Sequence, residues 1–432
     1  MRLRVLDVCD PGARSALGRL VDRLSDERSV DDAVYGILDE VRRRGDDALI
    51  DLTERFDRVR LDSLWVPKAE IEAAARRVDA DVLDALRSAR DRIEAFHRHE
   101  LPASWEAESD GVTYGQLARP LDTVGIYAPG GEAAYPSTVL MNGVPARLVG
   151  VRRLVLATPP GADGSVSAMV LAAARLCGID EVVRVGGAQA IGALAFGTET
   201  IPRVDKIVGP GNVYVNAAKR LVGGWVGIDG LAGPSEVVVL ADDAADADLI
   251  AADLLAQAEH DVRAMSILVT PSRDLAERVG ARIEARIATL DRRDTIARSL
   301  GEWGACVLVA DLDEGVEWVN RVAPEHLEVM TVAAFDLLPR LTRAGMILLG
   351  AETPVSLCDY GTGPNHVLPT GGTARFGSPL GIEDFVKRTN YMAATGGAPR
   401  RLIEQTVVLA KGEGLTAHAE AALARLRGRG TT

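Results

Sequence analysis

Residues 181–212, EVVRVGGAQAIGALAFGTETIPRVDKIVGPGN, decide the fold class of this chain. Two short runs rich in valine and isoleucine, at 181–185 and 206–208, each end in glycines, and an alanine-rich run at 188–197 lies between them. β-Branched runs favour strands, whereas an apolar, alanine-rich run of that length favours a helix. Strand, glycine turn and helix in alternation are typical of βαβ units, which build a parallel sheet.

The same alternation continues on both sides of this stretch. Further strands are predicted in RRLVLATPP (152–160) and WVGID (225–229), and helices in VSAMVLAAARLCG (166–178) and NVYVNAAKRLVGG (212–224). A second series of strands and helices begins at EVVVLADD (236–243) and runs to GMILLGAE (345–352). The chain is therefore predicted to hold two Rossmann-like α/β domains with parallel-rich sheets.

Helical segments are predicted before and after these series. Residues 31–56 and 79–99 repeat apolar side chains three and four positions apart, which is typical of amphipathic helices. The pattern becomes polar and helical again from about residue 381. We expect an N-terminal arm (1–24), a first, discontinuous α/β domain that includes the helical opening (25–126 and 235–380), a second α/β domain inserted into it (127–234), and a helical C-terminal tail (381–432).

Composition excludes several classes of protein. With 432 residues, of which 47% are hydrophobic, the chain can bury a large core. Its 62 acidic and 49 basic side chains give a net charge of -13, which repels nucleic acid and anionic membranes. No run approaches the roughly 20 apolar residues of a membrane span, and the N-terminus lacks the apolar core of a signal peptide. Four scattered cysteines predict neither a disulfide framework nor a thiolate zinc site, so a reducing cytoplasm is the expected setting.

The stretch RVAPEHLEV (321–329) places Glu325 beside His326, directly after Pro324. Neighbouring residues on a regular helix point about 100° apart, so the two side chains could face one ligand only from a turn or the end of an element. Pro324 predicts such an end. In the first turn of a helix, Glu325 would also be favoured as a carboxylate by the helix dipole. From these residues alone, a solvated surface pair is the alternative.

Four of the six histidines lie near other polar side chains, in an arrangement that suits a metal ion. Gln257 and His260 are one helical turn apart, so an amide oxygen and an imidazole would share a helix face. The four histidines occur in LLAQAEHD with Gln257 and His260, in APEHLEV with His326, in CDYGTGPNHVLPT with Asp359 and His366 in a loop, and in GEGLTAHAEA with Glu413 and His418. Glutamine, aspartate and histidine without thiolates suit zinc or a similar divalent ion, although each histidine alone is more typical of a structural or surface residue. His97 and His99 are expected to be exposed on a charged helix.

Glycine-rich loops follow three of the predicted strands. They are APGG (128–131), VGGAQA (185–190) and VGPGN (208–212). In α/β sheets the ligand crevice lies outside the carboxyl ends of the strands, and glycine lets the backbone approach the ligand closely. A dinucleotide fits such a crevice, although neither G-x-G-x-x-G nor G-x-x-x-x-G-K-S/T is present, and tight strand-to-helix turns are the alternative.

Several stretches together resemble one family, the zinc-dependent histidinol dehydrogenases of histidine biosynthesis. In the family's order and spacing, between about residues 120 and 420, the chain contains VGIYAPGGEAAYPSTVLMNGVPA, VGGAQAIGALAFGTETIPRVDKIVGPGNVYV, VGIDGLAGPSEVVVLAD, AADLLAQAEHD, APEHLEV, DYGTGPNHVLPT and EGLTAHAEA. The resemblance implies a cytoplasmic enzyme that oxidises L-histidinol through L-histidinaldehyde to L-histidine with two NAD+ and water, the last step of histidine biosynthesis.

The resemblance also implies a role for each site residue. His326 would be the general base of both oxidations, and Glu325 would activate the water that adds to the aldehyde. One Zn2+ per subunit would be held by Gln257, His260, Asp359 and His418. Substrate would be contacted by these four ligands and His326, together with Ser235, His366 and Glu413. NAD would bind to the inserted domain, lined by Tyr127, Gln189 and Asn212.

The family is a homodimer in which the C-terminal tail crosses to the other subunit, so Glu413 and His418 are expected to complete the partner's active site. Two positions depart from the family pattern. Cys358 stands where the family usually has glycine, and we expect a small buried thiol there rather than a fifth ligand. Val262 stands where proline is common, which concerns loop stiffness.

Two other functions fit part of these motifs. One is a relative that uses the same zinc and NAD chemistry on another small polar alcohol, such as a sulfonated diol, although Glu413 favours an amino alcohol. The other is a catalytically silent α/β protein that binds NAD or a metal as a sensor or scaffold. The presence of both Glu325 and His326 argues against it.

Overall fold

A computed structural model describes residues 3–21, 30–130, 134–394 and 399–427 of the chain. Gly131 of the APGG motif and the ends of the predicted N-terminal arm and C-terminal tail lie outside the described residues. The chain divides into two compact units, Met1–Glu100 with Leu121–Phe385 and Leu101–Pro120 with Val386–Thr432. In the described part of the chain, no helix combines the length and apolar content that a membrane span requires.

The first unit contains a six-stranded sheet in which every neighbouring pair is parallel. Its strand order is β1 (Arg4–Asp7), β11 (Gly304–Leu308), β10 (Met265–Thr270), β9 (Glu236–Ala241), β12 (His326–Met330) and β13 (Met346–Leu349). The central strands are buried on both faces, which is why they read as continuous apolar runs. These strands confirm the second predicted α/β series.

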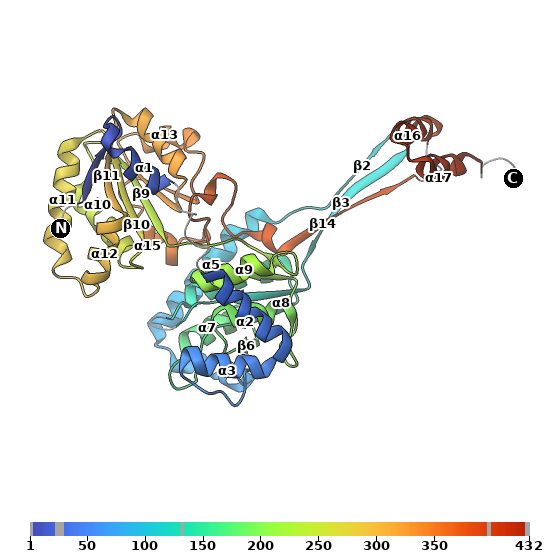
Figure 1. The fold of residues 1–432 in the computed structure, drawn as a ribbon, viewed down its shortest axis with the longest axis horizontal. Helices are drawn as coiled ribbons and strands as arrows, with labels where there is room; N and C mark the ends of the chain where they lie inside the picture. The colour runs from blue at the N-terminus through green and yellow to red at the C-terminus, as the bar shows by residue number, and fades with distance from the viewer. Residues whose placement is uncertain (1–2, 22–29, 131–133, 395–398, 428–432) are drawn as a thin grey trace. The chain divides into compact units, whose positions relative to one another are not determined.

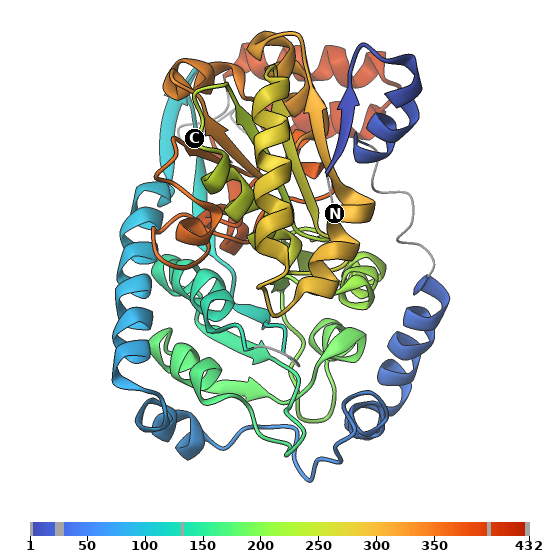
Figure 2. The same cartoon turned by 90° about the vertical axis from the view of Figure 1, so that its left-hand side faces the viewer.

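Helices cover both faces of this sheet and form two separate cores (Figure 1). One core lies under α10 (Ala247–Ala258), α11 (Arg273–Ile287) and α12 (Arg293–Trp303), and Figure 2 shows the yellow helix α11 in front of the strands. The other core lies under α1 (Arg14–Val21), α13 (Leu312–Val322) and α14 (Ala334–Leu337). A short helix, α15 (Val355–Tyr360), follows β13.

The first unit also contains a five-stranded parallel sheet. Its order is β6 (Glu181–Val183), β5 (Arg153–Ala157), β4 (Thr123–Tyr127), β7 (Lys206–Val208) and β8 (Gly227–Ile228). Its helices are α6 (Pro136–Val149) and α7 (Ala168–Leu176) in one core, and α8 (Gly187–Phe196) and α9 (Val213–Val222) in the other. The four strands and three helices predicted after residue 150 are all present.

The helical opening packs against this five-stranded sheet. Its helices are α2 (Asp31–Arg44), α3 (Asp46–Asp57), α4 (Lys68–Ala73) and α5 (Ala80–His97). Apolar stripes of α2 and α3 share a core with α8 and α9, and α5 shares one with α6 and α7. The opening is predicted from the sequence to belong to the other α/β domain, with residues 235–380. Helical periodicity shows which face of a helix is apolar but not which sheet covers that face. The domain boundaries as a whole stay a prediction.

His97 corrects a second expectation, because its side chain is fully buried rather than exposed. Its Nδ1 lies 2.7 Å from Glu100 Oε2, and its Nε2 lies 3.4 Å from the amide nitrogen of Asn365. The charged sequence around His97 hid the fact that this position faces the core at the end of α5.

The second unit is a three-stranded antiparallel sheet followed by two helices. The sheet order is β14 (Val386–Ala393), β3 (Val112–Pro120) and β2 (Trp105–Ser109). The helices α16 (Arg400–Gly412) and α17 (Thr416–Arg427) pack on each other through a small apolar cluster. The predicted tail was helical from about residue 381, whereas residues 386–393 form a strand. Most of β14 is exposed, so it carries no apolar alternation that would have revealed it.

A buried carboxyl group on β12, Glu328, bonds to the start of α15 and lies near the half-buried Asp253 of α10. The Glu328 side chain on β12 is buried, and its Oε1 accepts a hydrogen bond from Val355 N at the start of α15. Burial, followed by the charge of Asp253 on α10, raises the pKa of Glu328 to about 8. Burial also raises the pKa of Asp253 to about 6, against the opposing effect of its hydrogen bond with Glu328. Burial of Glu328 beside a second carboxyl group therefore favours its protonated form.

We predict that Glu328→Gln makes the stability of the chain less sensitive to a rise in pH from about 5 to about 7. The unfolded chain releases this proton near the usual pKa of about 4.3, whereas the folded chain keeps it until about pH 8. Its contribution to stability is fully present below the unfolded pKa and falls by up to about 1.4 kcal/mol per pH unit as pH rises. Glutamine has no proton to lose, so the variant should gain stability relative to the parent chain between about pH 5 and about pH 7. Urea unfolding at both pH values measures this, and a difference that does not change with pH contradicts it.

Candidate active site

Most of the predicted site residues line one cavity of about 320 Å³ in the first unit. Its wall combines loops after the carboxyl ends of β4 and β7 with residues at the amino ends of β9 and β12. The predicted residues that line it are Asn212, Ser235, Gln257, His260, Glu325, His326, Asp359 and His366. Two of the predicted glycine-rich loops, after β4 and β7, thus reach the cavity from carboxyl ends of strands, whereas the six-stranded sheet contributes amino ends.

Glu325 and His326 lie where the chain passes from a helix to a strand. Helix α13 ends at Val322, and Ala323 follows with a left-handed φ of 50°. His326 is the first residue of β12, so Glu325 lies outside any helix. The expected first-turn position of Glu325, and with it the dipole effect, is wrong. The expectation that an element end lets both side chains face one cavity is confirmed, and Glu325 Oε2 lies 3.5 Å from His326 Nδ1.

Glu236, which was not predicted as a site residue, holds Glu325 and His326 through hydrogen bonds of its backbone and side chain. Glu325 Oε2 accepts a hydrogen bond from Glu236 N (2.8 Å), and Glu236 Oε2 accepts one from Glu325 N (3.3 Å). His326 Nδ1 lies 3.2 Å from Glu236 O, which can only accept a hydrogen bond, so Nδ1 carries the proton of the neutral ring. The buried Nε2 has no hydrogen-bond partner among the described residues. This nitrogen is therefore free to accept a proton.

Charged neighbours favour the protonated form of His326. Burial disfavours the imidazolium, but the carboxylate of Glu325, the neighbouring Cys358 thiol and the carboxylate of Asp359 outweigh it and raise the pKa of His326 well above its usual value. Asp359 Oδ1 lies 3.8 Å from His326 Nε2. Cys358 is buried, as expected from the sequence, and is a free thiol.

The predicted metal ligands Gln257, His260 and Asp359 lie at or just beyond the ends of helices. Their sequence spacing had predicted a shared helix face for the first two and a loop for Asp359. Helix α10 ends at Ala258, so His260 lies beyond it and does not share a helical face with Gln257. His260 N instead donates to Gln257 O (3.2 Å), and this turn brings both side chains to the cavity. Asp359 belongs to the short helix α15, not to a loop. Sequence spacing alone could not show where α10 unwinds.

Gln257, His260 and Asp359 fit a divalent ion by their chemistry. The described residues contain no group of three or more His, Cys, Asp or Glu side chains arranged as a metal site. Gln257, whose amide is outside that set of residue types, is buried and has an amide nitrogen without a partner. Because the two ends of an amide are assigned rather than observed, this marks one amide position of Gln257 as available to a ligand. Amide oxygen, imidazole nitrogen and carboxylate oxygen form a donor set that suits zinc.

His366 is held in a fixed orientation at the wall of the cavity. Its Nδ1 donates to Asp359 O (2.8 Å), and its Nε2 lies 3.3 Å from Thr138 Oγ1. Burial, the largest effect, lowers the pKa of His366. A neutral ring with Nδ1 protonated leaves Nε2 as an acceptor, which Thr138 can satisfy.

Two of the predicted dinucleotide contacts do not line this cavity. Tyr127, at the end of β4, accepts a hydrogen bond from Gly187 N at the start of α8 through its hydroxyl oxygen (3.1 Å). Burial raises the pKa of Tyr127 to about 12, so the phenol stays neutral. Gln189 is buried in α8. Asn212, which does line the cavity, caps α9 by accepting from Tyr214 N and Val215 N.

Glu413 and His418 belong to the second unit. Glu413 is the C-cap of α16 and His418 lies in α17, and both are exposed. The expectation that they complete a partner's active site stays a prediction.

One family model, two sequence relatives and one solved structure that match this chain share one description. A family model described as histidinol dehydrogenase matches residues 21–426. The histidinol dehydrogenase of Gluconobacter oxydans is 51% identical over 410 residues, which cover 94% of this chain and 95% of that protein. The histidinol dehydrogenase of Heliobacterium mobile is 49% identical over 413 residues, with 94% and 97% covered. A crystal structure of histidinol dehydrogenase from Elizabethkingia anophelis matches 99% of both chains with a TM-score of 0.93 and 34% identity.

Proposed function

This chain belongs to the histidinol dehydrogenase family, and from that premise we propose that it oxidises L-histidinol to L-histidine in two successive steps. It is an oxidoreductase. Each step would transfer one hydride to NAD+, and water would enter between them. The observation that carries this proposal is the pair Glu325 and His326, which faces one cavity together with Ser235, Gln257 and Asp359.

In the first step, His326 is the general base. Its Nε2 would take the hydroxyl proton of the alcohol while the hydride on the same carbon leaves for NAD+, which forms the aldehyde, NADH and a proton. The carbonyl of Glu236 fixes the ring, so Nε2 rather than Nδ1 is available for this transfer. A base used in two oxidations must release its proton between them, and since Glu325 and Asp359 raise the pKa of His326, the general base is the fraction of enzyme in which this ring is neutral.

In the second step, Glu325 would take a proton from the water that adds to the aldehyde. The hydrate then loses a hydride to a second NAD+ and its hydroxyl proton to His326, which yields the carboxylic acid. The N–H of Glu236 holds one oxygen of the Glu325 carboxylate, so the group keeps its orientation through both steps. Ser235, immediately before this N–H, would contact the substrate.

Zinc would be held by Gln257, His260 and Asp359, with His418 of the tail as the fourth ligand. When bound, the ion supplies orientation, because it would hold the imidazole and amino nitrogens of the substrate. Donor chemistry and the unpaired amide position of Gln257 support this assignment. His366 would contact the substrate from the wall of the same cavity.

NAD would bind at the carboxyl end of the five-stranded sheet, where Tyr127, Gln189 and Asn212 lie on or beside strand-to-helix turns. Turns of this kind present backbone N–H groups and a helix N-terminus to a ligand's phosphates. The start of α8 and the capped start of α9 support this placement.

The active enzyme would be a homodimer in which Glu413 and His418 reach the substrate and the metal of the other subunit. The support for this proposal is that the cavity holds three of the four expected zinc ligands and most of the expected substrate contacts, while the remaining two residues are exposed on a separate unit.

Limiting L-histidinol should release about two NADH per substrate molecule, because the same site carries out both oxidations. Absorbance of NADH at complete conversion measures the yield. Glu325→Gln should slow the second oxidation by about 10²-fold or more, since it removes the base that activates water. A yield of one NADH from the parent chain, with aldehyde accumulating, contradicts the proposal.

Purified protein should contain about one divalent ion per chain. Replacing His260 with alanine should lower that content, since one of the proposed ligands is lost, while His99→Ala, a change at an exposed histidine away from the cavity, should not. Metal analysis after dialysis gives both values. Full activity of the metal-free parent chain would contradict the zinc assignment.

Mixed dimers test the shared site. His418→Ala and His326→Ala homodimers should each be inactive. Exchange of equal amounts should restore about a quarter of the total activity, because about half the dimers become mixed and one of the two sites in each mixed dimer is intact. Histidinol oxidation after exchange is measured, with exchange followed by differently tagged chains. Persistent inactivity despite complete exchange shows that each site lies within one chain.

A further inference from the structure

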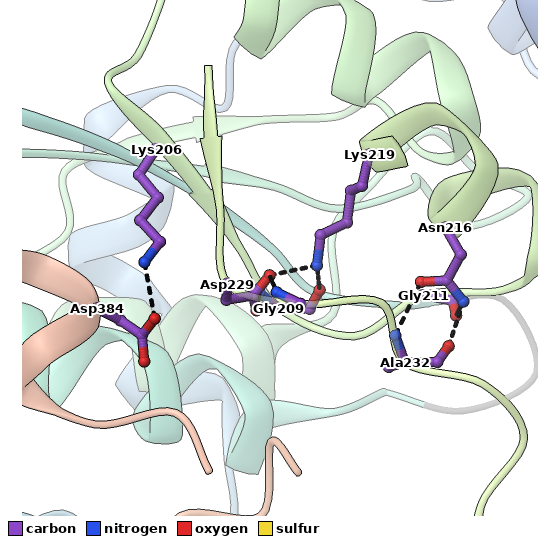
Figure 3. Close-up of polar contacts among 9 residues, drawn as sticks. Lys206, Gly209, Gly211, Asn216, Lys219, Asp229, Ala232 and Asp384 are labelled. Atoms are coloured by element: carbon purple, nitrogen blue, oxygen red, sulfur yellow. Dashed lines mark hydrogen bonds and ion pairs between the residues drawn. The ribbon is translucent and has the colours of Figure 1, made fainter. Parts of the chain in front are cut away.

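A buried lysine on α9 holds the backbone of the loop that ends β7. Only 1% of the Lys219 side chain is exposed, and its Nζ donates to Gly209 O (3.0 Å) and to the Asp229 carboxylate. Asp229 Oδ2 in turn accepts from Gly209 N (2.8 Å). Figure 3 shows this ion pair, with Lys219 and Asp229 both reaching Gly209. The pair therefore binds both backbone groups of a single residue.

The backbone conformation and surroundings of residue 209 require glycine. Its φ of 110° lies in the region that favours glycine, and an added Cβ would come within 2.1 Å of Tyr127 O. The loop thus passes directly against the end of β4. It continues through Gly211 to Asn212, which lines the cavity and caps α9.

Asn216 makes a second, uncharged link between the same two segments. Its Nδ2 donates to Gly211 O (3.2 Å) and to Ala232 O, and its Oδ1 accepts from Ala232 N (3.2 Å) (Figure 3). Together, the Lys219–Asp229 pair and Asn216 join loop 209–212 to segment 229–232. We call these contacts the loop clamp.

Segment 229–232 leads from the five-stranded sheet to the six-stranded one. Gly233 N donates to Thr370 Oγ1, and Ser235 lies at the cavity just before β9 begins at Glu236. Glu236 is the residue whose backbone holds Glu325 and His326. The loop clamp therefore links the predicted dinucleotide contact Asn212 to β9, whose first residue, Glu236, holds the catalytic pair.

Stability alone is a weak reason for burying these charges. Removing two ions from water carries a desolvation penalty that apolar side chains of similar volume avoid, so a buried ion pair is often no more stabilising than they are. Its hydrogen bonds to one glycine, by contrast, define the position of the loop in a way that apolar packing would not.

We propose that Lys219 and Asp229 are positioning residues that set the distance between the bound nicotinamide dinucleotide and the substrate. The inference rests on the proposed function. Hydride transfer needs the two carbons in close contact, and a displacement of about 1 Å can lower the rate by about 10²-fold. The loop clamp would position the dinucleotide, because it holds the loop that carries Asn212. Loss of the clamp would leave the substrate contacts of the six-stranded sheet in place.

Two variants test the clamp, and a third is a matched control. Lys219→Met removes the ion pair with Asp229. Asn216→Ala removes the uncharged bonds and leaves the ion pair intact. Asn216→Ala therefore still tests the clamp if the buried Asp229 charge prevents Lys219→Met from folding. Lys206→Met is the control, because the Lys206–Asp384 ion pair (2.7 Å) lies on the same sheet but makes no bond to loop 209–212 (Figure 3). All three should first be shown to fold by circular dichroism.

Both clamp variants should lower kcat for histidinol oxidation by about 10-fold to 100-fold and weaken NAD+ binding, measured by calorimetry, by about 10-fold. The KM for histidinol and the metal content should stay within about 2-fold of the parent values, since no zinc or substrate contact changes. Histidinol deuterated at the reacting carbon should show a larger isotope effect on kcat, because hydride transfer becomes slower. Lys206→Met should leave every value within about 2-fold.

The outcomes separate this inference from the proposed function. Folded clamp variants with unchanged kcat and NAD+ affinity overturn the inference, and so does an equal loss of NAD+ affinity, histidinol affinity and metal, which indicates a general structural role. If the parent chain binds NAD+ but does not oxidise histidinol, the proposed function fails and the clamp is judged by NAD+ binding alone. If the parent chain binds no NAD+, both fail.

Discussion

The reciprocal hydrogen bonds between Glu236 and Glu325 are the constraint on which the site depends. Each carboxylate accepts the backbone N–H of the other residue, at the amino ends of the adjacent strands β9 and β12. Buried N–H groups at strand ends need partners, and a carboxylate that accepts them satisfies both itself and the backbone. Glu236 Oε1 also accepts from Gly371 N, so one side chain fixes three chain segments. His326 is oriented by the same residue through its carbonyl.

This constraint places the chemistry at the less usual end of the sheet. In an open parallel sheet the ligand crevice normally lies beyond the carboxyl ends of the strands. The five-stranded sheet obeys this rule at the loops after β4 and β7, whereas the six-stranded sheet presents the amino ends of β9 and β12 to the same cavity. The two sheets thus contribute opposite ends to one site. In the proposed function, the dinucleotide and the metal-held substrate would approach each other from different sheets.

Much of the fold could be predicted, because buried parallel strands and amphipathic helices leave strong apolar patterns. Even the pairing of Glu325 with His326 followed from Pro324, although the proline preceded a strand rather than a helix. The errors share a physical cause: polar residues at element ends. Helix α10 ends before His260, His97 is buried against a distant segment that contains Asn365, and β14 is exposed on most of its length. None of these follows from local periodicity, which reports the apolar face and not the tertiary partner.

Polar residues at element ends position the site, whereas the apolar cores stabilise the fold. The elements that carry it are joined by a few side-chain-to-backbone bonds: Glu236 to Glu325, Glu328 to Val355, and Lys219 to Gly209. The apolar cores beneath both sheets are large and do not involve these bonds. Losing one such bond changes the global free energy by a few kcal/mol at most, but moves a catalytic segment directly. Function is therefore expected to be more sensitive than folding to substitutions at these few positions, and the positions are recognisable as buried polar side chains that bond to backbone across elements.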